Sequence, residues 1–321
     1  MSDYSPPPPS WKAITGYPIL TCNLSATAPD GSNYGGWLND GTGGFKTAIA
    51  ALAAAGPGGS LYVRGTYKPT TTVPTITGLN RNAAIFEGGA GFIVTSGTTY
   101  TVYSNYSQST GSRNIPSLLV ASCTDTDIIG YSGSDDGTGG ANSTGILFGG
   151  GLTRIRLTNP RVLNIHRFGY HVTGYASVSG GSTYDGDILG ISMDAPMADS
   201  CGQNVSGGDG GPIKLTTGSQ THNVYDIDLT AVRFTNCLQI GVDIISTSGT
   251  TGVLRGIRII GGVITFSPSL NAGMSSAVGL HLEDSASGTG GISDETFVGL
   301  RIDGAGLALA AAVISSPFWV R

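Results

Sequence analysis

The sequence predicts an all-β solenoid, a fold in which short strands stack coil upon coil, with one α-helix near the N-terminus. Glycine is unusually frequent, at 52 of 321 residues, and only 12% of the residues are charged, against about 25% in a typical soluble domain. Short apolar-x-apolar runs recur along most of the chain and are bounded by Gly, Asn, Ser or Thr. Only one segment, 45–55, has the apolar spacing of an amphipathic helix.

The composition argues against several classes of protein. A net charge of −5 without a basic cluster disfavours binding to nucleic acid through its phosphates. Long helices laced with Glu and Lys are excluded, because the chain has three Glu and four Lys residues. Intrinsic disorder fits poorly with 39% hydrophobic residues. A β-rich protein with a large core remains, in one large domain or two small ones.

Residues 1–38 are expected to form an extended N-terminal arm that leads into the solenoid. The prolines at 6–9 favour polyproline II, which has no internal hydrogen bonds, so the arm is either a flexible tail or an attachment device. No basic stretch followed by an apolar stretch is present, so no secretion signal is predicted. The longest apolar run, 305–314, is about half a membrane span. We therefore expect no membrane span, and either a virion protein released by lysis or a mature chain cut from a secreted precursor.

The segment 45–55 is predicted to be a helix because its apolar residues fall on one face. They lie at i, i+3, i+4 and i+7, and they are Phe45, Ala48, Ile49 and Leu52. Thr42 could cap the N-terminus, and Gly56 followed by Pro57 would end the helix. The next segment, 58–67, is typical of a turn followed by a short alternating strand.

The later apolar runs group into a loose repeat of a strand, a sharp turn, a second strand, a turn with Asn, and a third strand. Corresponding strands begin 30 to 43 residues apart, at Ile155, Ile188, Ile227, Ile257 and Leu300. A sandwich or barrel of antiparallel hairpins uses turns of about two or more residues, whereas here single residues separate strands within a unit. Strands that bend without reversing stack into a solenoid, in which each coil buries its apolar edge on the next.

The segment 39–67 resembles the start of a known family. It contains Asn39-Asp40-Gly41-Thr42, then the predicted helix, then Gly58-Gly59 and Gly65-Thr66-Tyr67. This pattern is similar to the entrance of pectate-lyase-like right-handed parallel β-helices, as in phage tail spikes and minor tail proteins. The family often has Asp-Asp-Thr where this chain has Thr42, Gly43 and Gly44, a difference that concerns only the cap of the helix.

The resemblance implies a single-stranded right-handed parallel β-helix over 39–303, with the capping helix at its N-terminal end. The remaining segment, 304–321, is apolar and has no polar cap. The end of a solenoid needs a polar cap or a partner. We therefore expect 304–321 to be a C-terminal cap or an assembly segment that packs against sister chains or another virion protein.

Relatives with this fold cleave acidic polysaccharides, so paired carboxylates are the chemistry to seek. The Arg-x-Pro-x-x-Arg segment of pectate lyases and the Gly-His-Gly motif of polygalacturonases are absent. A generic glycoside hydrolase needs two carboxyl groups about 5–10 Å apart, and residues i and i+2 of a strand share a face. Solvated turn aspartates have the same pattern. The candidate catalytic pairs are Asp185 with Asp187, Asp194 with Asp199, and Asp226 with Asp228.

The densest polar and aromatic cluster of the chain is a candidate glycan-binding site, formed by His166, Arg167, Tyr170 and His171. In this interpretation the tyrosine stacks on a sugar ring and the arginine grips an acid group. The cluster is equally consistent with an ordinary outward face of a coil.

No metal or other cofactor is expected. The four cysteines lack the CxxC spacing of zinc and redox sites, and buried free thiols are favoured over disulfides. They are Cys22, Cys123, Cys201 and Cys237.

Three functional hypotheses follow. The favoured one is a non-catalytic tail spike or minor tail protein of a virion, assembled as a homotrimer, joined to other tail proteins through the N-terminal arm or the C-terminal segment, and contacting host-surface polysaccharide. The second is a polysaccharide depolymerase, a hydrolase or lyase, on the same scaffold. The third is an extracellular surface or adhesive protein.

Overall fold

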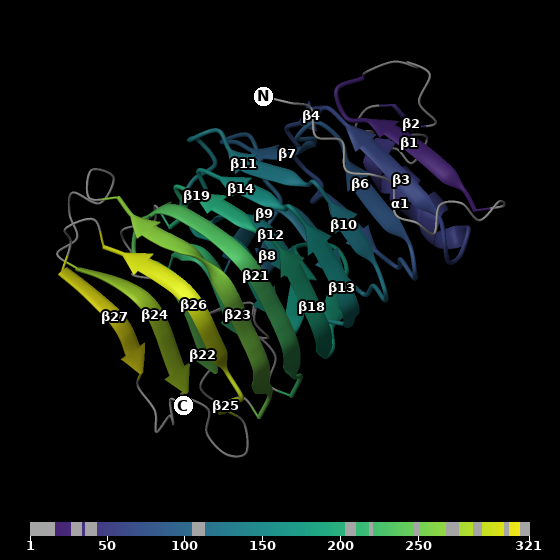
Figure 1. Ribbon diagram of the computed structural model, residues 1–321. Helices are drawn as coiled ribbons and strands as arrows, with labels where there is room; N and C mark the ends of the chain where they lie inside the picture. Colours follow the sequence, from purple (N-terminus) through teal and green to yellow (C-terminus); the bar gives the residue numbers. More distant parts are fainter. Residues whose placement is uncertain are drawn as a thin grey trace.

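The chain forms a stack of β-coils that runs the length of the molecule (Figure 1). The computed structural model describes residues 17–26, 34–35, 44–104, 113–202, 210–217, 221–246, 251–267, 276–284, 291–304 and 308–314. These residues contain one helix, and their strands lie in a 16-stranded and an 11-stranded sheet. The predicted all-β fold, a parallel β-helix with one helix, is confirmed.

Most strands lie on three faces, and the strands that these faces contain pair in parallel. The first face contains β1 (Ile19–Asn23), β2 (Tyr34–Gly35), β3 (Ser60–Arg64), β6 (Ala83–Phe86), β10 (Asp127–Ile129), β13 (Leu152–Thr158), β18 (Ile188–Asp194), the first halves of β21 (Val224–Cys237) and β23 (Val253–Phe266), and β25 (Gly291–Ser293). The second face contains β4 (Thr66–Tyr67), β7 (Gly91–Val94), β11 (Ser132–Asp135), β14 (Arg161–Leu163), β19 (Met197–Asp199), and the second halves of β21, β23 and β26 (Thr296–Asp303); the first half of β26 lies on the first face. The third face contains β5 (Thr75–Thr77), β9 (Arg113–Ala121), β12 (Ser143–Phe148), β15 (Phe168–Thr173), β20 (Gly211–Thr216), β22 (Ile240–Ser246), β24 (Ser276–Asp284) and β27 (Ala308–Ile314).

Each coil visits the three faces in turn. The chain passes from β13 to β14 to β15, and then repeats the circuit through β18, β19 and β20 one coil further along. Consecutive coils are therefore neighbours at the spacing of strands in a sheet, about 4.8 Å. Connections between parallel strands of this kind are right-handed in nearly all proteins.

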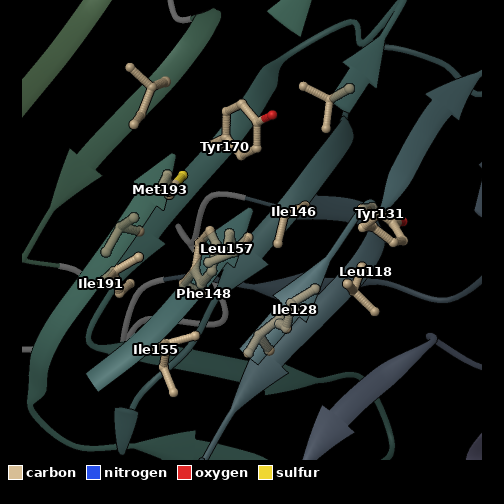
Figure 2. Packing of buried hydrophobic residues seen from close by; sticks show 14 of the residues in the cluster. Leu118, Ile128, Tyr131, Ile146, Phe148, Ile155, Leu157, Tyr170, Ile191 and Met193 are labelled. Atoms are coloured by element: carbon tan, nitrogen blue, oxygen red, sulfur yellow. The ribbon is translucent and has the colours of Figure 1, made fainter. Parts of the chain in front are cut away.

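Inward-facing residues stack into columns that form the core. One column on the first face contains Leu157, Met193, Leu229 and Ile259, which are in register and buried. Figure 2 shows part of this interior, where side chains of the first and third faces meet. Burying each such side chain contributes roughly 1.5–3 kcal/mol, so the repeated apolar-x-apolar runs supply the main stabilisation.

A single left-handed residue makes the corner between the first and second faces. Asn159, Ala195, Ala231, Gly261 and Gly299 occupy equivalent positions in five coils, with φ of 51°, 50°, 52°, 69° and 65°. One residue in this conformation bends a strand without reversing it. The structure therefore confirms the predicted one-residue turns between strands of a unit.

The helix α1 (Gly44–Ala54) covers the N-terminal end of the stack, within one residue of the predicted range. Its buried residues include Phe45, Ile49 and Leu52, and it packs on β1, β3 and β5. The ring of Phe45 lies 5.1 Å from that of Phe92. The helix thus shields the apolar columns from water, as a capping helix does.

One layer was not predicted. The short strands β8 (Val102–Tyr103), β16 (Tyr175–Val178) and β17 (Thr183–Asp185) form an antiparallel sheet outside the third face. This layer covers Leu119 and Leu147, which point outward in register from β9 and β12. It buries a second, smaller apolar cluster that solenoid periodicity alone does not reveal.

Strands of the solenoid are found on both sides of the predicted range 39–303. Most of the predicted arm, including residues 1–16, lies outside the described residues, but β1 within 1–38 already pairs with β3. At the other end β27 pairs with β24, so the third face continues past residue 303. Much of the predicted 304–321 cap lies outside the described residues. The four cysteines are buried and free, and in the described part of the chain no helix is long and apolar enough to cross a membrane.

Candidate functional site

A charged groove lies on the first face near the N-terminal end of the solenoid. Its volume is about 460 Å³. The lining residues, which we call the arginine groove, are Tyr17, Gly58, Arg81, Asn82, Asp125, Asp127, Arg154 and Arg156.

Strand register brings these charged side chains together. Asp127 of β10 lies opposite Arg156 of β13, and a bridge between Thr124 and Thr153 places Asp125 beside Arg154. The intervening residues point inward and are buried, so the charged ones point outward. Residues 29 apart in the sequence therefore become direct neighbours across one coil step.

Arg154 and Arg156 each grip one aspartate with two hydrogen bonds. Nη2 of Arg154 donates to Oδ2 of Asp125 at 2.7 Å, and Nε donates to Oδ1. Nε and Nη2 of Arg156 donate to the two carboxylate oxygens of Asp127 at 2.7 and 2.9 Å. Arg81 approaches Asp125 from the preceding coil, with Nε 3.8 Å from Oδ2. A guanidinium has five N–H donors, so each bidentate arginine keeps donors for a ligand.

The ion pairs favour the charged forms of Asp125, Arg154 and Arg156. The hydrogen bond from Arg154 lowers the pKa of the Asp125 carboxyl below its ordinary value. The partner aspartates in turn raise the pKa of Arg154 and of Arg156. Three arginines and two aspartates leave the groove with a net positive charge in a chain whose net charge is −5.

Tyr17 and Asn82 complete the groove at its edge. The ring of Tyr17 lies on the backbone of Gly58, where a Cβ would come within 2.1 Å of Cε1, yet the tyrosine remains 44% exposed. Asn82 is buried, donates to the carbonyl of Gly56 at 2.9 Å and accepts from the amide of Asn80 at 2.8 Å. The groove thus presents oriented donors, acceptors and one exposed aromatic ring on hydrogen-bonded coils.

The predicted pair Asp226 and Asp228 lies in the same two outward columns as Asp125 and Asp127, three coils further along. Asp228 is gripped by Arg258, whose Nη2 donates to Oδ2 at 2.7 Å. Asp226 is exposed, with a left-handed φ of 55°, and Gly256 replaces the arginine that stands opposite Asp125. Asp228 is therefore committed to an ion pair, and Asp226 is an unpaired acid next to it among the described residues.

The predicted pair Asp185 and Asp187 meets at a histidine that the sequence did not single out. Nε2 of His222 lies 3.1 Å from Oδ1 of Asp185, and Nδ1 lies 3.5 Å from Oδ1 of Asp187. Oδ1 of Asp187 also accepts from the amide of Asn223 at 2.8 Å. All three side chains of this trio are partly exposed.

The remaining predicted pair, Asp194 and Asp199, does not converge on one point. Asp194 accepts from the hydroxyl of Thr230, and Asp199 accepts from that of Thr235. Each carboxylate therefore links its own coil to the next.

The predicted glycan cluster is divided by the wall of the solenoid. Tyr170 points inward and is fully buried, with its hydroxyl 2.8 Å from the carbonyls of Pro160 and Met197. Burial raises the pKa of this hydroxyl. A buried ring has no face for a sugar, because it occupies an inward position of β15.

The other three members are also occupied by contacts within the protein. His166 contacts the buried Asp135 through Nδ1 at 3.1 Å, and Arg167 donates to the carbonyl of Arg113 at 2.7 Å. His171 is buried with Nδ1 3.3 Å from Oδ1 of Asn114. Periodicity correctly placed these residues on neighbouring positions, but not on one open surface.

The sequence carries a signal for the arginine groove that local periodicity does not reveal. Asp125-Thr126-Asp127 is followed 29 residues later by Arg154-Ile155-Arg156, and Asp226-Ile227-Asp228 is followed 30 residues later by Gly256-Ile257-Arg258. Recognising this needs the length of the intervening coil. Within the described residues, no group of three or more His, Cys, Asp or Glu side chains could hold a metal ion.

Comparisons with known proteins support a limited statement. No protein family and no curated protein sequence matches the chain, so membership of the pectate-lyase-like family stays a prediction. The structure is similar to the crystal structure of the Dettilon tailspike protein gp208, with a TM-score of 0.30 and 10% identity, over 87% of this chain and 67% of that chain. The fold assignment rests on the strand register described above.

Proposed function

We propose that the protein is a tail spike or minor tail protein of a virion, and that it binds host-surface polysaccharide in the arginine groove. The groove carries this proposal, because it offers what a sugar chain requires. Guanidinium groups donate to hydroxyl or acidic oxygens, aspartate oxygens accept from hydroxyls, and Tyr17 supplies an exposed ring.

The groove favours binding over cleavage. A glycoside hydrolase needs one carboxylic acid that holds a proton and one carboxylate. Here Arg154 keeps the pKa of Asp125 low, and Asp127 accepts two hydrogen bonds from Arg156. Neither carboxyl group is placed to donate a proton, so the groove holds its ligand without cutting it.

The place in a virion rests on further features of the chain. The proline-rich arm suits attachment to another tail protein, and the apolar 304–321 segment suits packing against two sister chains in a homotrimer. A stack of coils whose strands pair from one coil to the next suits an exposed, elongated appendage. Electron microscopy of the purified protein tests the trimer directly.

Binding to labelled bacterial surface polysaccharides tests the groove. The double variant Arg154→Ala/Arg156→Ala removes two charged donors, each of which typically contributes about 1.5–3 kcal/mol, and we expect affinity to fall by roughly a hundredfold or more. Arg258→Ala is the matched control, because it breaks the equivalent pair with Asp228 three coils away.

Two results would contradict the proposal. One is that the wild type binds polysaccharide and the double variant binds it with the same affinity. The other is an equal loss in Arg258→Ala, which would indicate a general effect of charge on the first face.

A depolymerase is the second candidate, favoured by the trio of Asp185, Asp187 and His222. Two partly exposed carboxylates that contact one imidazole are the arrangement most similar to an acid–base pair in the described residues. Release of reducing ends from polysaccharide by the wild type, lost in Asp187→Asn and kept in the groove variant, would support this candidate. No release by the wild type would exclude it for the polysaccharides tested.

A further inference from the structure

A row of ionisable residues crosses the outward side of the third face. His171 of β15, Lys214 of β20, Asp243 of β22 and His281 of β24 are direct neighbours in strand register. They continue the column that contains Leu119 and Leu147 in the two preceding coils. The outward column therefore changes from apolar to ionisable residues half-way along the solenoid.

The central members of this row are largely removed from water. The side chain of Asp243 is 2% exposed, that of Lys214 is 12% exposed and that of His281 is 20% exposed. Buried charges are tolerated when they are paired. The pairing within the row therefore decides the stability of the coils that carry it.

Asp243 is held from both sides. Nζ of Lys214 lies 3.3 Å from Oδ2, and Nδ1 of His281 lies 2.8 Å from Oδ1. On its other side, Nε2 of His281 lies 3.7 Å from Oε2 of Glu283. His281 thus sits between two carboxylates, one on β22 and one on its own strand.

The protonation state of His281 sets the charge of this group. Only the imidazolium carries a proton on both nitrogens, whereas the neutral ring donates from one. With His281 protonated, Lys214 and His281 balance Asp243 and Glu283. With His281 neutral, the group has a net negative charge. The ring then lacks a proton on one nitrogen, either on Nε2, which faces Glu283, or on Nδ1, which faces Asp243.

The surrounding charges favour the imidazolium. The groups that face His281 are Asp243 from β22, Lys214 from β20 and Glu283 from β24, with Asp284 next along the same strand; β27 has no ionisable residue from 308 to 314. The hydrogen bond to Asp243 raises the pKa of His281 above its ordinary value of 6.5, against a smaller opposing effect of burial.

We propose that His281 is a pH-sensitive clasp that holds β24 on β22. In its protonated form it bonds Asp243 and attracts Glu283, and in its neutral form one of these contacts is lost and β24 is less tightly held. Folding raises the pKa of His281, so the protonated histidine stabilises the folded state. This stabilisation is fully present below the ordinary pKa of histidine and is lost as the pH rises through the pKa in the folded protein. This inference is independent of the arginine groove.

Hydrogen exchange of the full chain tests the clasp. Protection of β24 peptides, corrected for intrinsic exchange, is expected to fall several-fold between about pH 5.5 and about pH 8, while protection of β9 and β12 peptides stays constant. In His281→Gln the pH dependence of β24 should disappear. The matched control is His166→Gln, which removes the other histidine bonded to a buried aspartate, Asp135, and should leave the response of β24 unchanged.

Two results of this hydrogen-exchange experiment would contradict the clasp. A pH response of β24 that persists in His281→Gln, or no response in the wild type, would overturn the proposal. If His281→Gln does not fold, Glu283→Gln replaces it. That substitution removes one of the two charges that favour the imidazolium, so the midpoint of the pH response should shift to lower pH, and an unchanged midpoint would count against the clasp.

Discussion

Ala195 and Ala231 hold the left-handed backbone that elsewhere in their column belongs to Asn159, Gly261 and Gly299. The left-handed conformation costs a non-glycine L-residue roughly 1–2 kcal/mol, because Cβ approaches the following carbonyl. The surrounding strands impose it nevertheless, since both flanking segments are held in parallel register. Residue preference at this corner is therefore subordinate to the stacking of coils.

This conflict predicts that Ala231→Gly stabilises the protein. Relief of the left-handed strain exceeds the additional entropy of glycine in the unfolded chain, about 0.5–1 kcal/mol, so we expect a net gain of about 0.5–1 kcal/mol. The measurement is the unfolding free energy from denaturant titration. Gly261→Ala in the next coil is the reciprocal control, because its Cβ would meet no atom within 4 Å, and it should lose a similar amount. A destabilised Ala231→Gly would show that the alanine is not strained.

At the scale of elements, the strands of the first face show how one pattern serves two purposes. Inward positions are aliphatic in coil after coil, while outward positions pair an aspartate of one coil with an arginine of the next. The inward pattern was readable from the sequence because alternation is local. The outward pairing of aspartate with arginine could not be predicted from the sequence, because it depends on which residues 29 or 30 positions apart come into register.

Glu295, in the short link between β25 and β26, breaks the inward pattern. The register of β23 with β25 and β26 places Glu295 opposite Ile257, in the column that contains Ile155, Ile191 and Ile227 in earlier coils. Burial raises the pKa of this carboxyl from 4.5 to about 7. Between about pH 4.5 and about pH 7, the folded protein therefore keeps a proton on Glu295 that the unfolded chain releases.

This raised pKa predicts a stability that falls with rising pH. The contribution of Glu295 is most favourable below about pH 4.5 and is lost as the pH approaches about 7. Glu295→Gln should remove this part of the pH dependence, and Glu295→Ile should raise the unfolding free energy more at pH 8 than at pH 4. Unfolding curves at a series of pH values check both, and an unaltered pH profile in Glu295→Gln would contradict the assignment.

At the scale of the whole molecule, the stack explains both the success and the failure of sequence reasoning about the site. Asp185 and Asp187 were found, but their partner His222 comes from the following coil, 35 residues after Asp187. Tyr170 and His171 belong to one dense cluster in the sequence, yet neighbouring residues of a strand point to opposite sides, and Tyr170 is the inward one. The outer sheet of β8, β16 and β17 then covers part of a face that periodicity alone would leave open.

The sequence by itself determined the stacked β-fold, the capping helix and most of the residues of the core. These follow from local rules: alternation of apolar side chains, single left-handed residues at corners, and helical spacing in one segment. Only the tertiary structure decided which outward residues form the arginine groove, the trio around His222 and the row at His281. The physical reason is that the coils differ in length, so the register that brings distant residues within hydrogen-bonding distance is set by the packing of the whole stack.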